Sequence, residues 1–209
     1  IEEYNAAFSS PERKAQAIGE ARALRAIRYF RLVRCFGGVP MILDTNLDNW
    51  TPARASEEEV YQQIIADLTY AMNNLPDTPP GGIISDDPDK IEWGRVTRYA
   101  AMGVLAKVYM SAPDGIRDYQ QAKTLLESII NSGNYSLLPD WENLFNPDYR
   151  PGNLNPEMIW PVMFTNTFQG GGTKLSFYST TSQTWMRPTN EMYEFYEADD
   201  TRRSASLLQ

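Results

Sequence analysis

The sequence predicts a mostly α-helical fold, in which tetratricopeptide-like helix pairs carry a loop-rich face. Helical apolar periodicity with start and stop signals occurs four times before residue 135. Two of these helix pairs share the apolar spacing of tetratricopeptide repeats. Gly, Pro, Asn, Ser and Thr then crowd residues 146–190. We therefore expect a helical scaffold at residues 1–135 and, in the same domain, a loop-rich segment with short extended and helical pieces at residues 136–209.

The first helix is predicted from the Ser9–Glu12 cap through Phe36, where Gly37 and Gly38 end it. Its apolar face is expected to comprise Ile18, Ala21, Leu24, Ile27, Phe30 and Val33. The flanking apolar residues place Cys35 on this side, which predicts a buried thiol. Arginines recur every three residues from Arg22 to Arg34, and we interpret them as a solvated or acid-paired stripe.

Three further helices follow. Ser56 and Glu59 form a capping box that starts the second helix, and Pro76 closes it. The third helix is predicted from Thr97 to Met110, and a fourth runs from the Asp118 cap to Gly133.

These helices contain a weak internal repeat. One spacing of 0, 3, 4 and 7 residues is shared by Tyr29, Leu32, Val33, Phe36 and by Met102, Leu105, Ala106, Tyr109. The partner helices share the spacing 0, 4 and 7 through Ile64, Leu68, Ala71 and through Ala122, Leu126, Ile129. Two ordinary amphipathic hairpins remain the alternative interpretation.

The second half has fewer regular signals. Residues 158–164 have the apolar composition of a buried extended segment, and a short final helix is predicted from Asn190 to Glu197. The Asp-rich stretch at 86–89 lacks the glycine and terminal glutamate of an EF-hand, which favours a polar loop over a calcium site.

Composition excludes several function classes. The chain has 209 residues, with 19 basic and 27 acidic side chains and a net charge of −8, which argues against nucleic-acid binding. It has no histidine, so His-dependent triads and His-ligated zinc are excluded, and its single cysteine cannot form an intrachain disulfide. We expect no metal, no cofactor and no catalytic residues.

The chain carries no stretch of about 18 apolar residues that could span a bilayer. It begins at Ile1 without a signal peptide and ends at Gln209 without a helix stop signal. We therefore expect it to be an internal piece of a longer mature protein.

The stretch Glu20–Pro40 (EARALRAIRYFRLVRCFGGVP) resembles the most distinctive helix of the SusD/RagB family of outer-membrane nutrient-binding lipoproteins from Bacteroidetes. Further similarities follow in order along nearly the whole chain. They comprise residues 56–76, Gly94–Thr97 with Ala106–Tyr109, Tyr119–Ala122, Ser132–Leu138, Asn155–Trp160, Arg187–Glu191 and Asp200–Arg203.

This resemblance implies a SusD-like fold and a binding protein that is not an enzyme. Such proteins sit on the cell surface at the outer membrane through a lipidated N-terminal cysteine, which lies outside this chain. They capture glycans or peptides and deliver them to a TonB-dependent SusC-like barrel.

Glycan capture without catalysis requires aromatic faces against sugar C–H groups and planar polar groups that bond to hydroxyls. Trp185 lies in a polar, aromatic-rich loop, in the region where family members often place a binding aromatic residue. Tyr178, Gln183 and Arg187 accompany it, and Trp50 lies in a separate polar loop. For Trp185 a loop-anchoring role remains open. The other tryptophans, Trp93, Trp141 and Trp160, are expected in the core.

Other functions remain as alternatives. Within the family, the chain could belong to a peptide-binding or structural subunit of an outer-membrane complex. A glycosidase would require a pair of carboxylates, such as Glu157 with Asp199 or Asp200. A cytoplasmic tetratricopeptide adaptor would require shorter turns and a repetitive second half.

Overall fold

The fold was analysed in a computed structural model that describes residues 8–43, 52–79, 94–144, 155–161, 190–197 and 199–200. These residues include four long helices: α1 (Pro11–Phe36), α2 (Glu57–Asn74), α3 (Arg98–Ser111) and α4 (Tyr119–Asn131). A 3₁₀ helix η3 (Trp141–Leu144) and a short helix α6 (Asn190–Phe195) follow. Within the described ranges no β-strand forms, and one isolated bridge joins Pro40 to Arg54. The mostly helical fold class is confirmed.

The predicted caps set the boundaries of α1. The Ser10 side chain accepts a hydrogen bond from the Arg13 backbone N–H, and Pro11 occupies the first helical position. Gly37 ends the helix with a φ of 67°, a left-handed conformation that favours glycine. Both signals are local, which is why the sequence predicted this helix so closely.

α2 begins with the predicted capping box. The Ser56 hydroxyl accepts from the Glu59 backbone N–H, and the Glu59 carboxylate accepts from the Ser56 backbone N–H at 2.7 Å. The backbone and hydroxyl hydrogen bonds from Ser56 lower the pKa of Glu59. Thr97 and Asp118 cap α3 and α4 in the same way, each with a side-chain oxygen that accepts from the backbone three residues ahead.

Replacing Ser56 with alanine is expected to lower the free energy of unfolding by about 1 kcal/mol, because the Glu59 N–H loses its acceptor at the helix start. Urea denaturation measures the change. Ser128→Ala is the matched control, since its hydroxyl only donates to the Thr124 carbonyl inside α4. An equal effect of the two substitutions would contradict a role for the cap.

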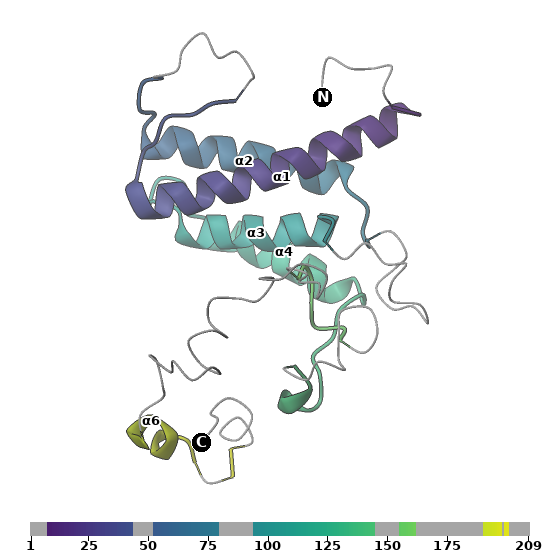
Figure 1. The fold of residues 1–209 in the computed structure, drawn as a ribbon, viewed down its shortest axis with the longest axis vertical. Coiled ribbons are helices and arrows are strands. Elements are labelled where there is room, and N and C mark those ends of the chain that lie inside the picture. The colour runs from purple at the N-terminus through teal and green to yellow at the C-terminus, as the bar shows by residue number, and fades with distance from the viewer. Residues whose placement is uncertain are drawn as a thin grey trace, which may run out of the picture.

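The four helices form a stack in chain order. Figure 1 shows α1 beside α2 and, across the core from them, α3 beside α4, while α6 lies apart at the other end of the molecule. α2 packs against both α1 and α3. The largest fully buried core side chains come from α2 and α3, namely Val60, Ile64, Leu68, Leu105 and Val108. This arrangement agrees with consecutive helix pairs.

The apolar face predicted for α1 is confirmed at Ile18, Phe30 and Val33, which are buried, and wrong at Ala21 and Leu24, which are exposed. Leu24 and Leu32 are exposed, and Phe36 at the helix end is 64% exposed. The residues that α1 buries are Ile18, Gly19, Ala23, Ala26, Phe30 and Val33. α1 is apolar on two sides, so periodicity alone did not determine which side faces α2. On α4, Leu126 is likewise exposed, whereas Ala122 and Ile129 are buried as expected.

Cys35 is exposed, so the prediction of a buried thiol is wrong. The buried positions of α1 end at Val33, and two further residues rotate the side chain by about 200°, away from the core. Among the tryptophans expected in the core, Trp160 packs partly buried against it, whereas Trp141 on η3 is 39% exposed. Trp93 lies outside the described residues.

Two predicted features of the loops fall partly or wholly outside the described residues. Residues 158–161 of the expected extended segment form irregular backbone with bends, without strand pairing, and residues 162–164 lie outside the described ranges. The Asp-rich stretch at 86–89 also lies outside them. The predicted final helix is confirmed, although it ends at Phe195, before Glu197.

Candidate functional site

The five predicted binding residues belong to two segments that fall outside the described residues. They are Trp50 in the first segment and Tyr178, Gln183, Trp185 and Arg187 in the second. The structure does describe the residues that lead into these segments, and their contacts show how the scaffold anchors the chain there.

The chain enters the first segment through residues 39–43, which two side chains of α1 fix. The Tyr29 hydroxyl accepts from the Ile42 backbone N–H at 2.7 Å and donates to the Ile42 carbonyl at 3.3 Å. The Arg25 guanidinium donates to the Leu43 carbonyl at 3.0 Å. The backbone that leads to Trp50 is therefore bonded to α1 until the last residue before the undescribed segment.

A buried carboxylate orients Arg25. Asp67 of α2 is fully buried and accepts two hydrogen bonds from Arg25, at 2.8 Å from Nε and 2.7 Å from Nη2. Gln63 donates a third, at 3.0 Å. A forked pair of this kind has a defined geometry, because the planar guanidinium matches the two carboxylate oxygens. Asp67 thus positions the Arg25 nitrogen that holds Leu43.

The chain returns beside its point of entry. The Ala55 N–H donates to the Val39 carbonyl at 3.1 Å, and the Arg54 guanidinium donates to the carbonyls of Phe36 and Gly38. These carbonyls lie at the end of α1, where cations are favoured. Val39 and Ala55, which lie before and after the segment that carries Trp50, are therefore held side by side next to the end of α1.

The chain enters the second segment from residues 155–161. The Trp160 indole N–H donates to the Gly94 carbonyl at 3.2 Å, just before α3. The Ser136 N–H donates to the Pro156 carbonyl at 3.3 Å, and the Leu138 N–H donates to the Glu157 carboxylate at 3.1 Å. Residues 155–161 are therefore tied to the chain just before α3 and to the chain after α4.

Buried polar and aromatic groups support this second entry. Asn155 and Thr97 are buried, and the Asn155 side chain accepts from the Glu157 N–H at 3.2 Å. Tyr99 and Tyr135 meet edge to face with ring centroids 5.8 Å apart. Burial raises the pKa of Tyr135, which keeps its hydroxyl neutral. Glu157, a candidate carboxylate of the glycosidase alternative, here fixes the backbone of Leu138.

The arginine stripe of α1 has several environments. Arg25 pairs with Asp67, which agrees with the acid-paired interpretation of the stripe. The Arg22 guanidinium lies 4.2 Å from the centroid of the Tyr70 ring. Sequence reasoning missed Asp67 as the partner. The sequence feature that could have identified Asp67 is a carboxylate next to Leu68 on the apolar side of α2, where Asp67 is buried.

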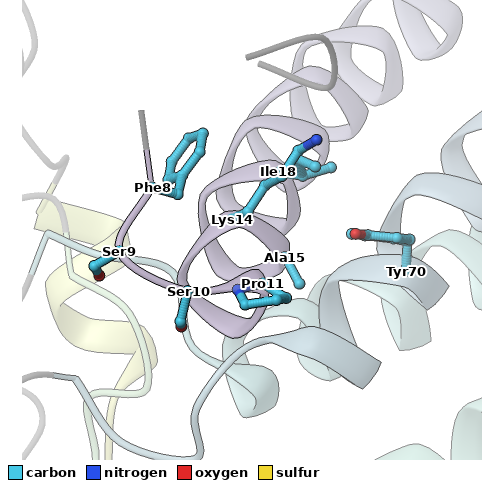
Figure 2. Close-up of a pocket in the computed structure, with 8 residues that line it drawn as sticks. All are labelled: Phe8, Ser9, Ser10, Pro11, Lys14, Ala15, Ile18 and Tyr70. Carbon is cyan, nitrogen blue, oxygen red and sulfur yellow. The ribbon is translucent and has the colours of Figure 1, made fainter. Parts of the chain in front are cut away.

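A shallow groove of about 630 Å³ lies at the start of α1 (Figure 2). Aromatic, hydroxyl and amine groups line it, from Phe8, Ser9, Ser10, Pro11, Lys14, Ala15, Ile18 and Tyr70. In the described part of the chain no cluster of metal-ligating side chains forms.

None of the described helices combines the length and hydropathy needed to cross a membrane. A SusD-like family model, described as starch-binding and associating with the outer membrane, matches residues 1–110, which is more than half of the chain. A SusD-like protein of Bacteroides ovatus is 34% identical over 155 residues, which cover 70% of this chain and 26% of that protein. The chain thus spans about a quarter of this relative's length.

Two solved structures are also similar. One, a crystal structure with a xylogluco-oligosaccharide, is 30% identical with a TM-score of 0.59, over 78% of this chain and 32% of that chain. The second, surface glycan-binding protein A from Bacteroides uniformis, has a TM-score of 0.74 over 97% of this chain and 44% of that chain. At 24% identity this second similarity supports the fold alone. The family match over more than half of the chain and the 34% identity to the Bacteroides ovatus protein show that the chain belongs to the SusD-like family.

Proposed function

We propose that this protein binds glycans at the cell surface and delivers them to a TonB-dependent SusC-like transporter in the outer membrane. The observation that carries the proposal is the match of residues 1–110 to a family described as starch-binding and associating with the outer membrane. A similar structure at 30% identity was determined with a xylogluco-oligosaccharide, which supports a carbohydrate as the ligand. The protein acts by binding and not by catalysis.

In this proposal the membrane attachment is a lipid anchor located outside residues 1–209. The partner barrel takes the captured glycan through the membrane. Both features come from the resemblance to the SusD/RagB family, and the chain itself contributes the helical scaffold and the segments that hold the ligand.

The proposed ligand contacts are made by Trp185 together with Tyr178, Gln183 and Arg187, and by Trp50 from the other segment. Aromatic rings pack against the apolar faces of sugar rings, while amide and guanidinium groups donate to hydroxyls. The anchoring described above supports these roles. Ordering the binding segments around a glycan costs less conformational entropy when those segments start from fixed backbone.

The proposal is tested by affinity gel electrophoresis of the full-length soluble protein through a panel of native neutral polysaccharides. We expect one glycan to retard the protein, and Trp185→Ala to abolish the retardation, since an aromatic stacking contact contributes roughly 1 kcal/mol or more. Trp141→Ala is the matched control, because Trp141 is a partly exposed tryptophan of η3 and is not among the proposed contacts. Thermal unfolding of each variant confirms that it folds.

The outcomes separate function from site. Retardation that persists in Trp185→Ala would support glycan binding and refute Trp185 as a contact. Retardation by no polysaccharide would refute glycan capture, and the same protein would then be tested with peptides, the ligands of the alternative function.

A further inference from the structure

Arg54 joins parts of the chain that are far apart in sequence. Its Nε donates to the Gly38 carbonyl and its Nη2 donates to the Phe36 carbonyl, 16 and 18 residues earlier. Beside it, the Ala55 N–H donates to the Val39 carbonyl at 3.1 Å. We call these three hydrogen bonds the Arg54 joint. The joint fixes where the intervening part of the chain leaves the scaffold and where it returns.

The helical scaffold holds the Arg54 joint in place. Val39 is buried in the core, and Ala55 packs against the same core. Gly38 lies so close to the start of α2 that an added Cβ would overlap the Ala55 carbonyl oxygen. Moving either end of the joint would therefore disturb the packing of α1 against α2. Both partners in each contact are described residues, so the joint does not depend on any other part of a longer chain.

Arg117 provides a comparison, because it also donates to a carbonyl at the end of a helix. Its Nε donates at 3.0 Å to the carbonyl of Ala112, the C-cap of α3, and its Nη1 pairs with Asp114 at 2.9 Å. Arg117 and Ala112 are only five residues apart, so this contact closes no long segment. Both arginines stabilise a helix end, whereas Arg54 alone also joins the two ends of a long segment.

We propose that Arg54 is a positioning residue for glycan binding, which acts through the segment that carries Trp50. The inference rests on the proposed function, in which Trp50 is a ligand contact. Bringing the ends of a long segment together costs conformational entropy. The Arg54 joint makes folding supply this ordering before the glycan arrives, so less of the cost opposes binding. Removing the guanidinium should therefore weaken glycan binding without removing a sugar contact.

Amide hydrogen exchange of the full-length protein without glycan tests the joint itself. In Arg54→Ala, the Ala55 and Ile42 amides should exchange at least about tenfold faster. Ala55 donates within the joint, and the Ile42 N–H donates to the Tyr29 hydroxyl just beyond it. Arg117→Ala is the matched control and should leave both rates unchanged. Unchanged rates in Arg54→Ala would overturn the inference.

Glycan affinity tests how the joint acts. It is measured from retardation in native gels that contain starch, xyloglucan or another neutral polysaccharide of the panel. Arg54→Ala should raise the Kd about fivefold, and Arg117→Ala should leave it unchanged. Trp50→Ala should itself weaken binding, and adding Arg54→Ala to it should raise the Kd by less than about twofold, because both act through one segment. Thermal unfolding shows whether each variant folds.

Arg54→Lys separates the charge of Arg54 from its geometry. Lysine keeps the positive charge but lacks the planar fork that bonds to the two carbonyls at once. Its affinity should therefore stay close to that of Arg54→Ala. Full recovery of binding in Arg54→Lys would show that the charge suffices and would overturn the positioning role.

The outcomes separate this inference from the proposed function. If no polysaccharide retards the wild type, the proposed function fails and the inference fails with it. If the wild type and Arg54→Ala are retarded equally, the inference alone fails. A weaker Arg54→Ala with unchanged exchange at Ala55, or with its full effect retained in Trp50→Ala, would indicate a direct sugar contact by Arg54 and overturn the positioning role.

Discussion

Replacing Asp67 with alanine is expected to lower the free energy of unfolding by about 3 kcal/mol. The carboxylate is fully buried and accepts three hydrogen bonds from Arg25 and Gln63. Its removal leaves the part-buried Arg25 guanidinium and the Gln63 amide without their acceptor. The midpoint and slope of urea denaturation give the change.

Asp77→Ala is the matched control for Asp67→Ala. Asp77 also pairs with an arginine, Arg98, at 2.9 Å, but the two side chains are 48% and 44% exposed. Water can replace an exposed partner, so this substitution should cost less than about 1 kcal/mol. Equal costs for the two aspartates would show that burial does not determine the strength of the Arg25–Asp67 pair.

Asp67→Ala should also loosen the chain that leads to Trp50. Arg25 donates to the Leu43 carbonyl from the same guanidinium that Asp67 orients. Amide hydrogen exchange near Ile42 and Leu43 should therefore accelerate in Asp67→Ala and stay unchanged in Asp77→Ala. Exchange that stays slow in both variants would contradict the positioning role of Asp67.

Replacing Gly38 with alanine is expected to cost about 2 to 3 kcal/mol. An added Cβ would overlap the Ala55 carbonyl oxygen and lie 3.1 Å from the Glu57 backbone nitrogen. Both groups are backbone at the start of α2, where the capping box fixes them. The clash can be relieved only by separating the end of α1 from the start of α2.

Gly115→Ala is the control for Gly38→Ala. No atom lies within 4 Å of a Cβ built at Gly115, and its backbone is not left-handed. The substitution should change stability by less than about 0.5 kcal/mol. Thermal unfolding compares the two variants, and a Gly38→Ala protein as stable as Gly115→Ala would refute the close approach of the two helix ends.

The helices were predictable because their start and stop signals are local. Ser56 and Glu59 lie three residues apart, so their hydrogen bonds form as soon as the first turn forms. The same holds for Thr97 at α3 and Asp118 at α4. Element boundaries fixed in this way depend little on the rest of the fold.

The candidate site was less predictable. Its aromatic residues, such as Trp185, came from a resemblance and remain a prediction. The groups that anchor the neighbouring chain came from the structure, since Arg25 and Asp67 are 42 residues apart and belong to different helices. No spacing rule within one helix connects them.

The sequence by itself determined the helical class, the capped helix boundaries and the SusD-like family. These depend on neighbours a few residues apart or on motifs in order along the chain. Only the tertiary structure decided which side of α1 is buried, because α1 is apolar on two opposite sides and either could pack against α2. That choice buried Ala26 and Phe30, exposed Leu24, Leu32 and Cys35, and left Arg28 and Arg31 facing outward.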